Sequence, residues 1–73
     1  MNKEQLQQLL IMARHKKGQL SHDDIASLSE VGITRQYYGM IENGDRRPSV
    51  KVAKAVSQVL DVEWTIFFEV EGN

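Results

Sequence analysis

One stretch decides the fold of this 73-residue chain: Gly32-Ile33-Thr34-Arg35-Gln36-Tyr37-Tyr38-Gly39-Met40-Ile41-Glu42-Asn43-Gly44. Gly32 can adopt the positive φ at which a helix stops, and Ile33 follows it as an apolar plug. The Thr34 hydroxyl can accept hydrogen bonds from free backbone N–H groups, so a new helix is predicted to begin there. Gly44 closes that helix. The stretch therefore predicts a tight turn followed by a short, capped helix.

The predicted helix has two differently built faces. At helical spacing, Tyr38 and Ile41 fall on the side that packs inward. The opposite side carries five residues that can meet solvent or a ligand: Arg35, Gln36, Gly39, Met40 and Asn43.

The chemistry of the second face matches the edges of DNA bases. Arg can bond guanine at two points, Gln can do the same to adenine, and an apolar group can meet a thymine methyl. We expect base contacts from Arg35 and Gln36, together with Met40 and Gly39. Met40 could instead fill a gap at the edge of the core. Glycine inside a helix costs about 1 kcal/mol relative to Ala, so Gly39 indicates either close approach of a DNA strand or local looseness.

Four further helices are predicted around this one. Ser21 and Ser49 are caps of the same kind as Thr34, and Gly18 ends the first helix after a basic run. Apolar residues recur at helical spacing in each segment. The predicted helices span residues 3–17, 21–31, 34–43, 49–60 and 63–69. No strand is indicated, so residues 1–73 are expected to form one compact all-α domain of five helices.

The spacing of these residues resembles the DNA-binding domain of the Xre family, the helix-turn-helix repressors of phage and Cro-like type. The match covers roughly residues 6–69. It is carried by these segments: Arg14-x-x-x-Gly18, Leu20-Ser21, Gly32-Ile33-Thr34-Arg35, Ile41-Glu42-Asn43-Gly44, Arg46-Arg47-Pro48-Ser49, and Leu60-Asp61-Val62 with Trp64 and Phe67-Phe68. The resemblance implies a five-helix, lambda-repressor-like domain whose second and third helices form the helix-turn-helix.

The second helix departs from the family pattern. Gly18 and Gly32 lie 14 positions apart. This is about three more than the family usually has, and three residues are nearly one helical turn. The second helix is therefore expected to be longer at its start. Its apolar stripe is predicted to consist of Ile25, Leu28 and Val31, with Leu28 where the family prefers a small alanine.

The loop after the third helix and the start of the fourth are polar and basic. Phosphate contacts fix the register of a protein on DNA without reading its sequence, and free N–H groups after Ser49 would add an anion site. The residues expected at phosphate are Tyr37, Asn43, Arg46, Arg47, Ser49 and Lys51. An ordinary solvated surface is the alternative. The family resemblance implies in addition a structural ion pair between Arg14 and Glu42.

Charge is unevenly distributed, although the net charge is only −1. All nine basic residues lie in residues 1–54 beside six acids, whereas residues 55–73 hold four acids and no base. This asymmetry indicates a body that meets phosphate and a tail that faces elsewhere. The sequence contains no cysteine, no membrane-length apolar run and no signal peptide, so a soluble cytoplasmic protein is expected.

No arrangement of residues indicates catalysis. The sequence contains neither a nucleophile–base constellation nor a glycine-rich phosphate loop. His15 and His22 with Asp23 and Asp24 match no metal-ligand spacing, and capping accounts for the two aspartates. We expect no enzymatic activity, no metal, no cofactor and no small-molecule substrate.

Large apolar side chains crowd the C-terminal segment. Five of them in seven positions, residues 64–70, exceed what one face of a short helix can bury. The surplus is expected to form a two-fold interface built from Trp64, Phe67, Phe68 and Val70, because a homodimer reads two half-sites about one turn of DNA apart.

These observations predict a sequence-specific transcriptional regulator. By analogy with the family, it would be a repressor that binds a pseudo-palindromic operator as a dimer. Since the chain has no room for a ligand-binding domain, an inducing signal would be a protein antagonist, proteolysis or simple concentration. The alternative is a protein-interaction module of the same fold, an antitoxin or adaptor, that docks through its aromatic C-terminus.

Overall fold

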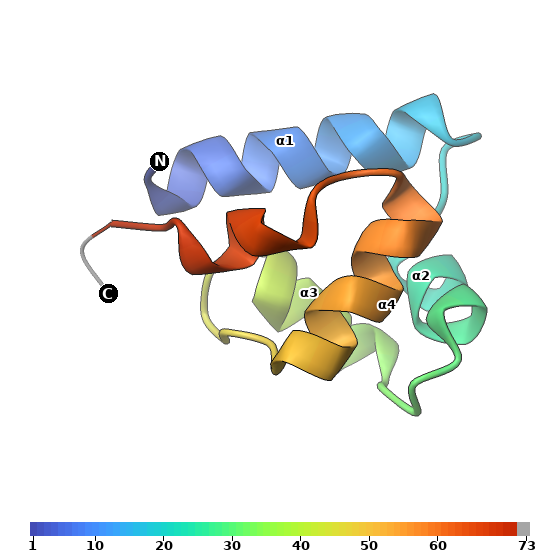
Figure 1. The fold of residues 1–73 in the computed structure, drawn as a ribbon. Helices are drawn as coiled ribbons and strands as arrows, with labels where there is room; N and C mark the ends of the chain where they lie inside the picture. The colour runs from blue at the N-terminus through green and yellow to red at the C-terminus, as the bar shows by residue number, and fades with distance from the viewer. Residues whose placement is uncertain (72–73) are drawn as a thin grey trace.

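The computed structural model describes residues 1–71, which form four α-helices and one short 3-10 helix (Figure 1). In chain order these are α1 (Lys3–Lys16), α2 (His22–Ser29), α3 (Arg35–Glu42), α4 (Val50–Leu60) and η1 (Trp64–Phe68). The described residues contain no strand, so the expectation of an all-α fold is confirmed. None of the helices in this part of the chain is long and apolar enough to span a membrane.

Every α-helix begins after a polar cap. The side chains of Asn2, Ser21, Thr34 and Ser49 each accept a hydrogen bond from the backbone N–H three residues further on, at 2.8–3.2 Å. At the first two caps the third residue, Gln5 or Asp24, bonds back to the cap backbone and completes a capping box. The observed starts lie within one residue of those predicted because capping is a local property of the sequence.

The predicted lengthening of α2 is wrong. The capping box fixes its start at His22, and Glu30 adopts a left-handed conformation, φ 57°, which ends the helix after Ser29. The extra residues lie in the connections on either side instead. Gln19, before the cap, is itself left-handed, and residues 30–34 make a long turn between α2 and α3.

The predicted fifth α-helix is a 3-10 helix. Glu63 precedes it without a side-chain cap, and the bond from the Ile66 N–H to the Glu63 carbonyl closes a three-residue turn at 3.3 Å. A segment of five residues without a cap gains too few α-helical hydrogen bonds to offset nucleation, so the tighter turn is favoured.

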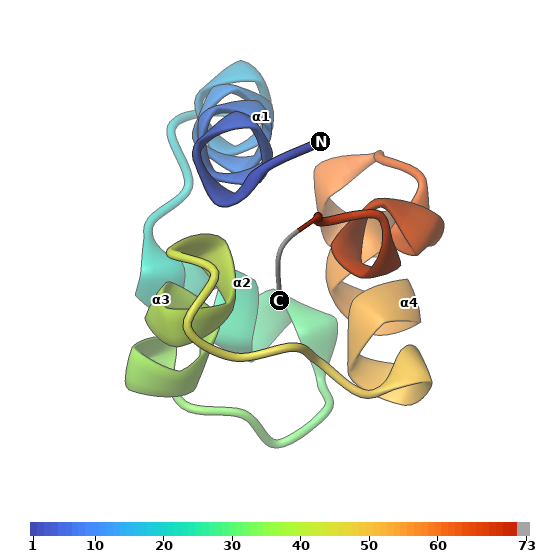
Figure 2. The ribbon, with the colours of Figure 1, turned by 90° about the vertical axis from the view of Figure 1, so that its left-hand side faces the viewer.

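The helices enclose one hydrophobic core. Figure 2 shows α1 and α3 on one side of it and α4 with η1 on the other. The most deeply buried apolar side chains come from all four α-helices and from η1: Leu10, Ile25, Tyr38, Ile41, Ala53, Val56, Leu60 and Phe67.

The apolar stripe predicted for α2 is only partly correct. Ile25 is fully buried, whereas Leu28 is 55% exposed and Val31 lies beyond the helix end. Ala26 and Ser29 are the other buried residues of α2. The buried face of α2 therefore includes two small side chains, and these let α2 pack closely against α3 and α4.

Candidate nucleic-acid interface

The first turn of α3 presents two polar side chains to solvent. Arg35 and Gln36 are both exposed, immediately after the Thr34 cap, whose hydroxyl accepts a hydrogen bond from the Tyr37 N–H at 3.0 Å. On the opposite side of the helix Tyr38 and Ile41 are buried in the core. The helix is thus held by its apolar face with its polar start free.

Met40 lies further along the exposed side of α3. Its side chain is 38% exposed, so it is available to a ligand while still covering part of the protein. This placement is compatible with contact to a thymine methyl, and the base contact stays a prediction.

The structure gives a reason for Gly39 that sequence reasoning missed. A Cβ atom at this position would lie 3.2 Å from Nδ1 and 3.5 Å from Cε1 of the His22 ring. The close neighbour of Gly39 is therefore a side chain of α2 and not empty space. Neither reason offered from the sequence, DNA approach or looseness, is needed to explain the glycine, and its contact with DNA remains a prediction.

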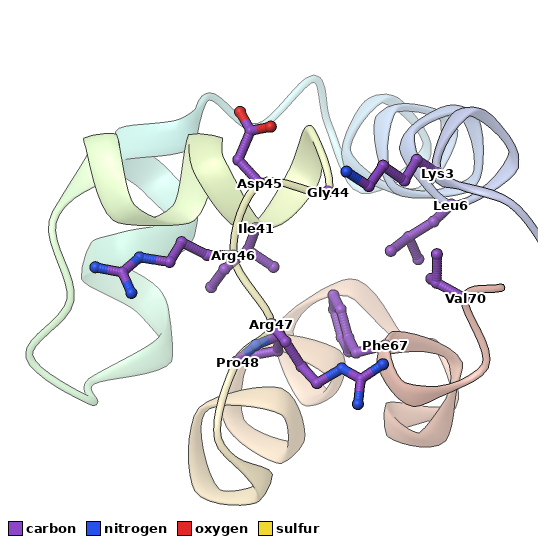
Figure 3. A pocket seen from close by; sticks show the side chains of 10 residues that line it. All are labelled: Lys3, Leu6, Ile41, Gly44, Asp45, Arg46, Arg47, Pro48, Phe67 and Val70. Atoms are coloured by element: carbon purple, nitrogen blue, oxygen red, sulfur yellow. The ribbon is translucent and has the colours of Figure 1, made fainter. Parts of the chain in front are cut away.

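The two loop arginines point in different directions (Figure 3), and each lies over an aromatic ring. The Arg46 guanidinium lies 5.9 Å from the centre of the Tyr37 ring, and that of Arg47 lies 5.8 Å from the centre of Phe68. Cation–π contacts at this distance are weakly attractive, and they leave the guanidinium N–H groups free to donate hydrogen bonds to a ligand. The half-buried Tyr37 thus supports Arg46 beside α3, while Arg47 extends toward η1.

A groove of about 400 Å³ lies between this loop and the start of α1. Leu6, Phe67 and Val70 form part of its lining, with Lys3 at one edge and Arg47 at the other (Figure 3). Gly44 is required at its rim, because a Cβ there would lie 2.9 Å from Cγ of Lys3 and the residue has φ 81°. The loop therefore packs closely against Lys3 of α1.

The remaining residues predicted to contact phosphate differ in whether their side chains already have hydrogen-bond partners within the protein. Lys51 is exposed at the start of α4. The Ser49 hydroxyl accepts a hydrogen bond from the Val52 N–H at 3.2 Å, as a helix cap. The Asn43 side chain accepts from Gln7 Nε2 at 2.7 Å, which ties the end of α3 to α1.

Arg14 and Glu42 form a two-point ion pair between α1 and α3. Arg14 donates from Nε to Glu42 Oε2 and from a terminal nitrogen to Oε1, both at 2.8 Å. Its other terminal nitrogen donates to the Leu20 carbonyl at 2.8 Å. The Glu42 side chain is only 3% exposed and that of Arg14 is 13% exposed. The pair therefore joins α1, α3 and the loop before α2.

Burial and this ion pair together shift the pKa values of Glu42 and Tyr38. Burial by itself would raise the pKa of Glu42, but hydrogen bonds from Arg14 and His22 outweigh it and lower that pKa below its ordinary value. Burial, reinforced by the Glu42 carboxylate, raises the pKa of the Tyr38 hydroxyl far above its ordinary value. Glu42 is therefore a carboxylate at neutral pH, and Tyr38 keeps its proton.

His22 belongs to this cluster, whereas from the sequence it is considered only as a metal ligand, and rejected as one. Its Nε2 lies 3.2 Å from Glu42 Oε1, and its ring meets that of Tyr38 edge-on at 5.3 Å between centres. An unexplained glycine inside a helix was the available signal that another side chain packs there. It did not identify which side chain, because that partner lies on a different helix.

The C-terminal segment exposes less apolar surface for a dimer interface than the sequence predicted. Phe67 is 2% exposed and Val70 is also buried, so these two residues belong to the core and not to an exposed interface. Trp64 and Phe68 are half-buried, with rings 6.0 Å apart in an edge-on arrangement. Lys54 Nζ lies 5.0 Å from the centre of the Trp64 ring. Two aromatic side chains remain for the expected contact between protomers.

A short exposed helix, held by a turn against a second helix and flanked by a basic loop, defines a helix-turn-helix protein of the DNA-binding class. Comparison with known proteins agrees with this assignment. The chain belongs to the helix-turn-helix family of the Xre-like type, whose model, described as "Helix-turn-helix", matches residues 17–67.

A curated relative comes from Bacillus subtilis (strain 168). It is an uncharacterised HTH-type transcriptional regulator, YqaF, and is 46% identical over 56 residues, which cover 77% of this chain and 70% of the relative. No solved structure matches the chain. Family and relative together place the chain among DNA-binding transcriptional regulators.

Proposed function

We propose that this protein is a transcriptional repressor that binds a two-fold symmetric operator as a homodimer. The observation that carries the proposal is the exposure of Arg35 and Gln36 in the first turn of α3, next to the Thr34 cap. In this class the start of the second helix of the motif enters the major groove. Occupation of the operator would then exclude RNA polymerase.

Each part of the surface has a role in this proposal. Arg35 and Gln36 read base edges, with Met40 and Gly39 beside them on the same face. The residues that hold phosphate are Tyr37, Asn43, Arg46, Arg47, Ser49 and Lys51. Contacts of this second kind set the position of the protein and carry no sequence information.

Dimer formation is proposed through the aromatic surface of η1. Trp64 and Phe68 are the two members of the predicted interface that keep exposed area. Two copies joined there would present two α3 helices to half-sites roughly one turn of DNA apart. The burial of Phe67 and Val70 also reduces the apolar surface on which a protein-interaction module would depend.

Selection of bound DNA from a random pool tests both parts of the proposal. A dimeric reader is expected to enrich a two-fold symmetric motif. Arg35→Ala should then weaken binding to that motif by about 1–3 kcal/mol and relax the preference at one base position, because a two-point contact to the base is lost.

The control for Arg35→Ala is Lys16→Ala, at the exposed end of α1. Melting temperatures of both variants should stay near that of the wild type, since neither side chain is buried. Enrichment of no motif would contradict sequence-specific binding. A motif without two-fold symmetry would contradict the dimer, and unchanged affinity of Arg35→Ala would contradict its role in base reading.

A further inference from the structure

One side of α1 carries apolar side chains at the surface. Met12 is 68% exposed, more than any other large apolar side chain of the described residues, and Leu9 beside it is half-buried. Figure 2, which views α1 end-on, shows this helix at a corner of the molecule. A groove of about 410 Å³ runs along this side, and Leu60 and Val62 complete its apolar lining.

This side of α1 points away from the helix that carries Arg35 and Gln36. The contacts of α1 with α3 include hydrogen bonds from the side chains of Gln7 and Arg14. At about 100° per residue, these two side chains project almost opposite to Leu9 and Met12. A molecule that covers Leu9 and Met12 therefore leaves the exposed side of α3 free.

We propose that this side of α1 packs against the same side of α1 in a second copy, with the two helices antiparallel. The inference rests on the proposed function and deepens it, because it adds α1 to the surface through which the homodimer forms. The two-fold axis passes between Leu9 and Met12, so that Leu9 of each copy faces Met12 of the other.

The order of residues along α1 makes the helix complementary to itself in this arrangement. Leu9 and Met12 meet at the centre, and Glu4 at one end of the helix faces Lys16 and Lys17 at the other end of the second copy. Charges of opposite sign across an interface favour a partner, and charges of like sign disfavour it. A parallel pair would instead place the two lysines of each copy against each other. The charges therefore select a second, antiparallel copy as the occupant.

The charged residues set the direction of the contact more than its strength. Within residues 1–71, Glu4 and Lys16 form no ion pair, whereas Lys17 Nζ lies 3.8 Å from Asp61 Oδ2 of its own chain. Ion pairs between exposed side chains contribute little to affinity. Loss of the Lys16 side chain alone should therefore change association little, and the apolar centre should provide most of the affinity.

The surface of η1 needs an addition of this kind. Trp64 and Phe68 are both half-buried, and a stable interface takes about 800 Å² from each partner. Val62 lines the groove beside α1 and precedes Trp64 by two residues, so the groove adjoins the η1 surface. One two-fold axis can therefore serve both surfaces.

The experiment measures the dissociation constant of the dimer by sedimentation equilibrium, without DNA, for the wild type, Met12→Glu and Leu28→Glu. Met12→Glu places two carboxylates in the apolar centre and should raise this constant at least about tenfold. Leu28, on α2, is the next most exposed large apolar residue at 55%, and Leu28→Glu should associate as the wild type does. Circular dichroism checks that both variants are folded, as expected for exposed positions.

A second measurement tests the antiparallel direction. The chain contains no cysteine, so Gln5→Cys and Lys16→Cys each introduce a single thiol. These two positions face each other across the proposed axis. When the two proteins are mixed and oxidised, they should form a disulfide-linked dimer, and each protein oxidised alone should give much less of it.

A wild-type dimer that Met12→Glu leaves intact would overturn the α1 contact, while the proposed dimer through η1 would stand. Cross-linking of Gln5→Cys or Lys16→Cys alone that equals cross-linking of the mixture would overturn the antiparallel arrangement. A wild type that is monomeric at all concentrations would overturn both the contact and the proposed dimer. Selection of bound DNA would still decide whether the protein reads sequence.

Discussion

Glu42 connects more of the structure than any neighbouring residue of α3. Its carboxylate accepts hydrogen bonds from Arg14 on α1 and from His22 on α2, so three helices meet at one side chain. Removal of one partner from a buried ion pair leaves the other without compensation, which costs about 3–5 kcal/mol where burial is complete. Arg14 keeps some contact with solvent, and the cost here should lie at or below the lower end of that range.

The pKa of Glu42 makes this contribution pH-dependent. In the folded protein that pKa is lowered from its ordinary value of 4.5. The stabilisation is therefore fully present above the pKa of the unfolded chain and is lost as pH falls through the lower pKa of the folded state. Glu42→Gln should be less stable than the wild type by about 2–3 kcal/mol at neutral pH, and this gap should narrow to below about 1 kcal/mol near pH 3.

Urea unfolding at several pH values measures the gap for Glu42→Gln. The control is Glu63→Gln, whose side chain is exposed and caps no helix. That variant should follow the wild type at each pH. A gap for Glu42→Gln that is the same at neutral and acid pH would show that ionisation of this carboxylate does not contribute.

At the scale of the element, helix starts could be predicted from the sequence and buried faces only in part. Ser21, Thr34 and Ser49 act within three residues of themselves, so their effect is visible in the local sequence. The exposure of Arg35 and Gln36 followed from the same local reasoning. Tertiary contacts decide which face of each helix is buried.

The α2 helix illustrates the limit of periodicity. At about 100° per residue, Leu28 falls on the opposite side of Ile25 from Ala26 and Ser29. Either side could be buried, and hydrophobicity favoured Leu28. In the structure the small side chains are buried, because they allow α2 to approach α3 and α4. His22 lies on that same side, which is why its contact with Gly39 could not be predicted from the sequence of either helix alone.

Alanine substitutions on α2 distinguish the two faces. Ile25→Ala should destabilise the protein by about 2–5 kcal/mol. In so small a chain this loss is enough to leave the variant partly or wholly unfolded before urea is added. Leu28→Ala, on the same helix, removes a similar side chain from an exposed position and should change stability by less than about 0.5 kcal/mol. Urea midpoints of the two variants measure this difference. A large loss of stability in Leu28→Ala would place the Leu28 side chain in the core or in an interface.

At the scale of the whole molecule, charge is separated along the chain. The basic residues all lie in residues 1–54, which include α3 and the loop with Arg46 and Arg47. The four acidic residues after position 55 lie close to η1 in the sequence, on either side of it. A protein with net charge −1 is therefore not excluded from DNA, because the basic residues around the loop can attract phosphate locally.

The same separation predicts a moderate dependence of DNA binding on salt. Each phosphate neutralised contributes about −0.9 to the slope of log affinity against log salt concentration. Contacts from Arg46, Arg47 and Lys51 would give about −2.7 per protomer, or about −5.4 for a dimer, by the same relation. Arg47→Ala should reduce the magnitude of this slope by about 1 per protomer. It should also weaken binding to selected and random DNA alike, because phosphate contacts are independent of sequence.

Titrations of DNA binding at several salt concentrations measure both effects, with Lys16→Ala as the control that keeps the wild-type slope. An unchanged slope for Arg47→Ala would mean that this side chain, which lies over Phe68, stays with η1 when DNA binds.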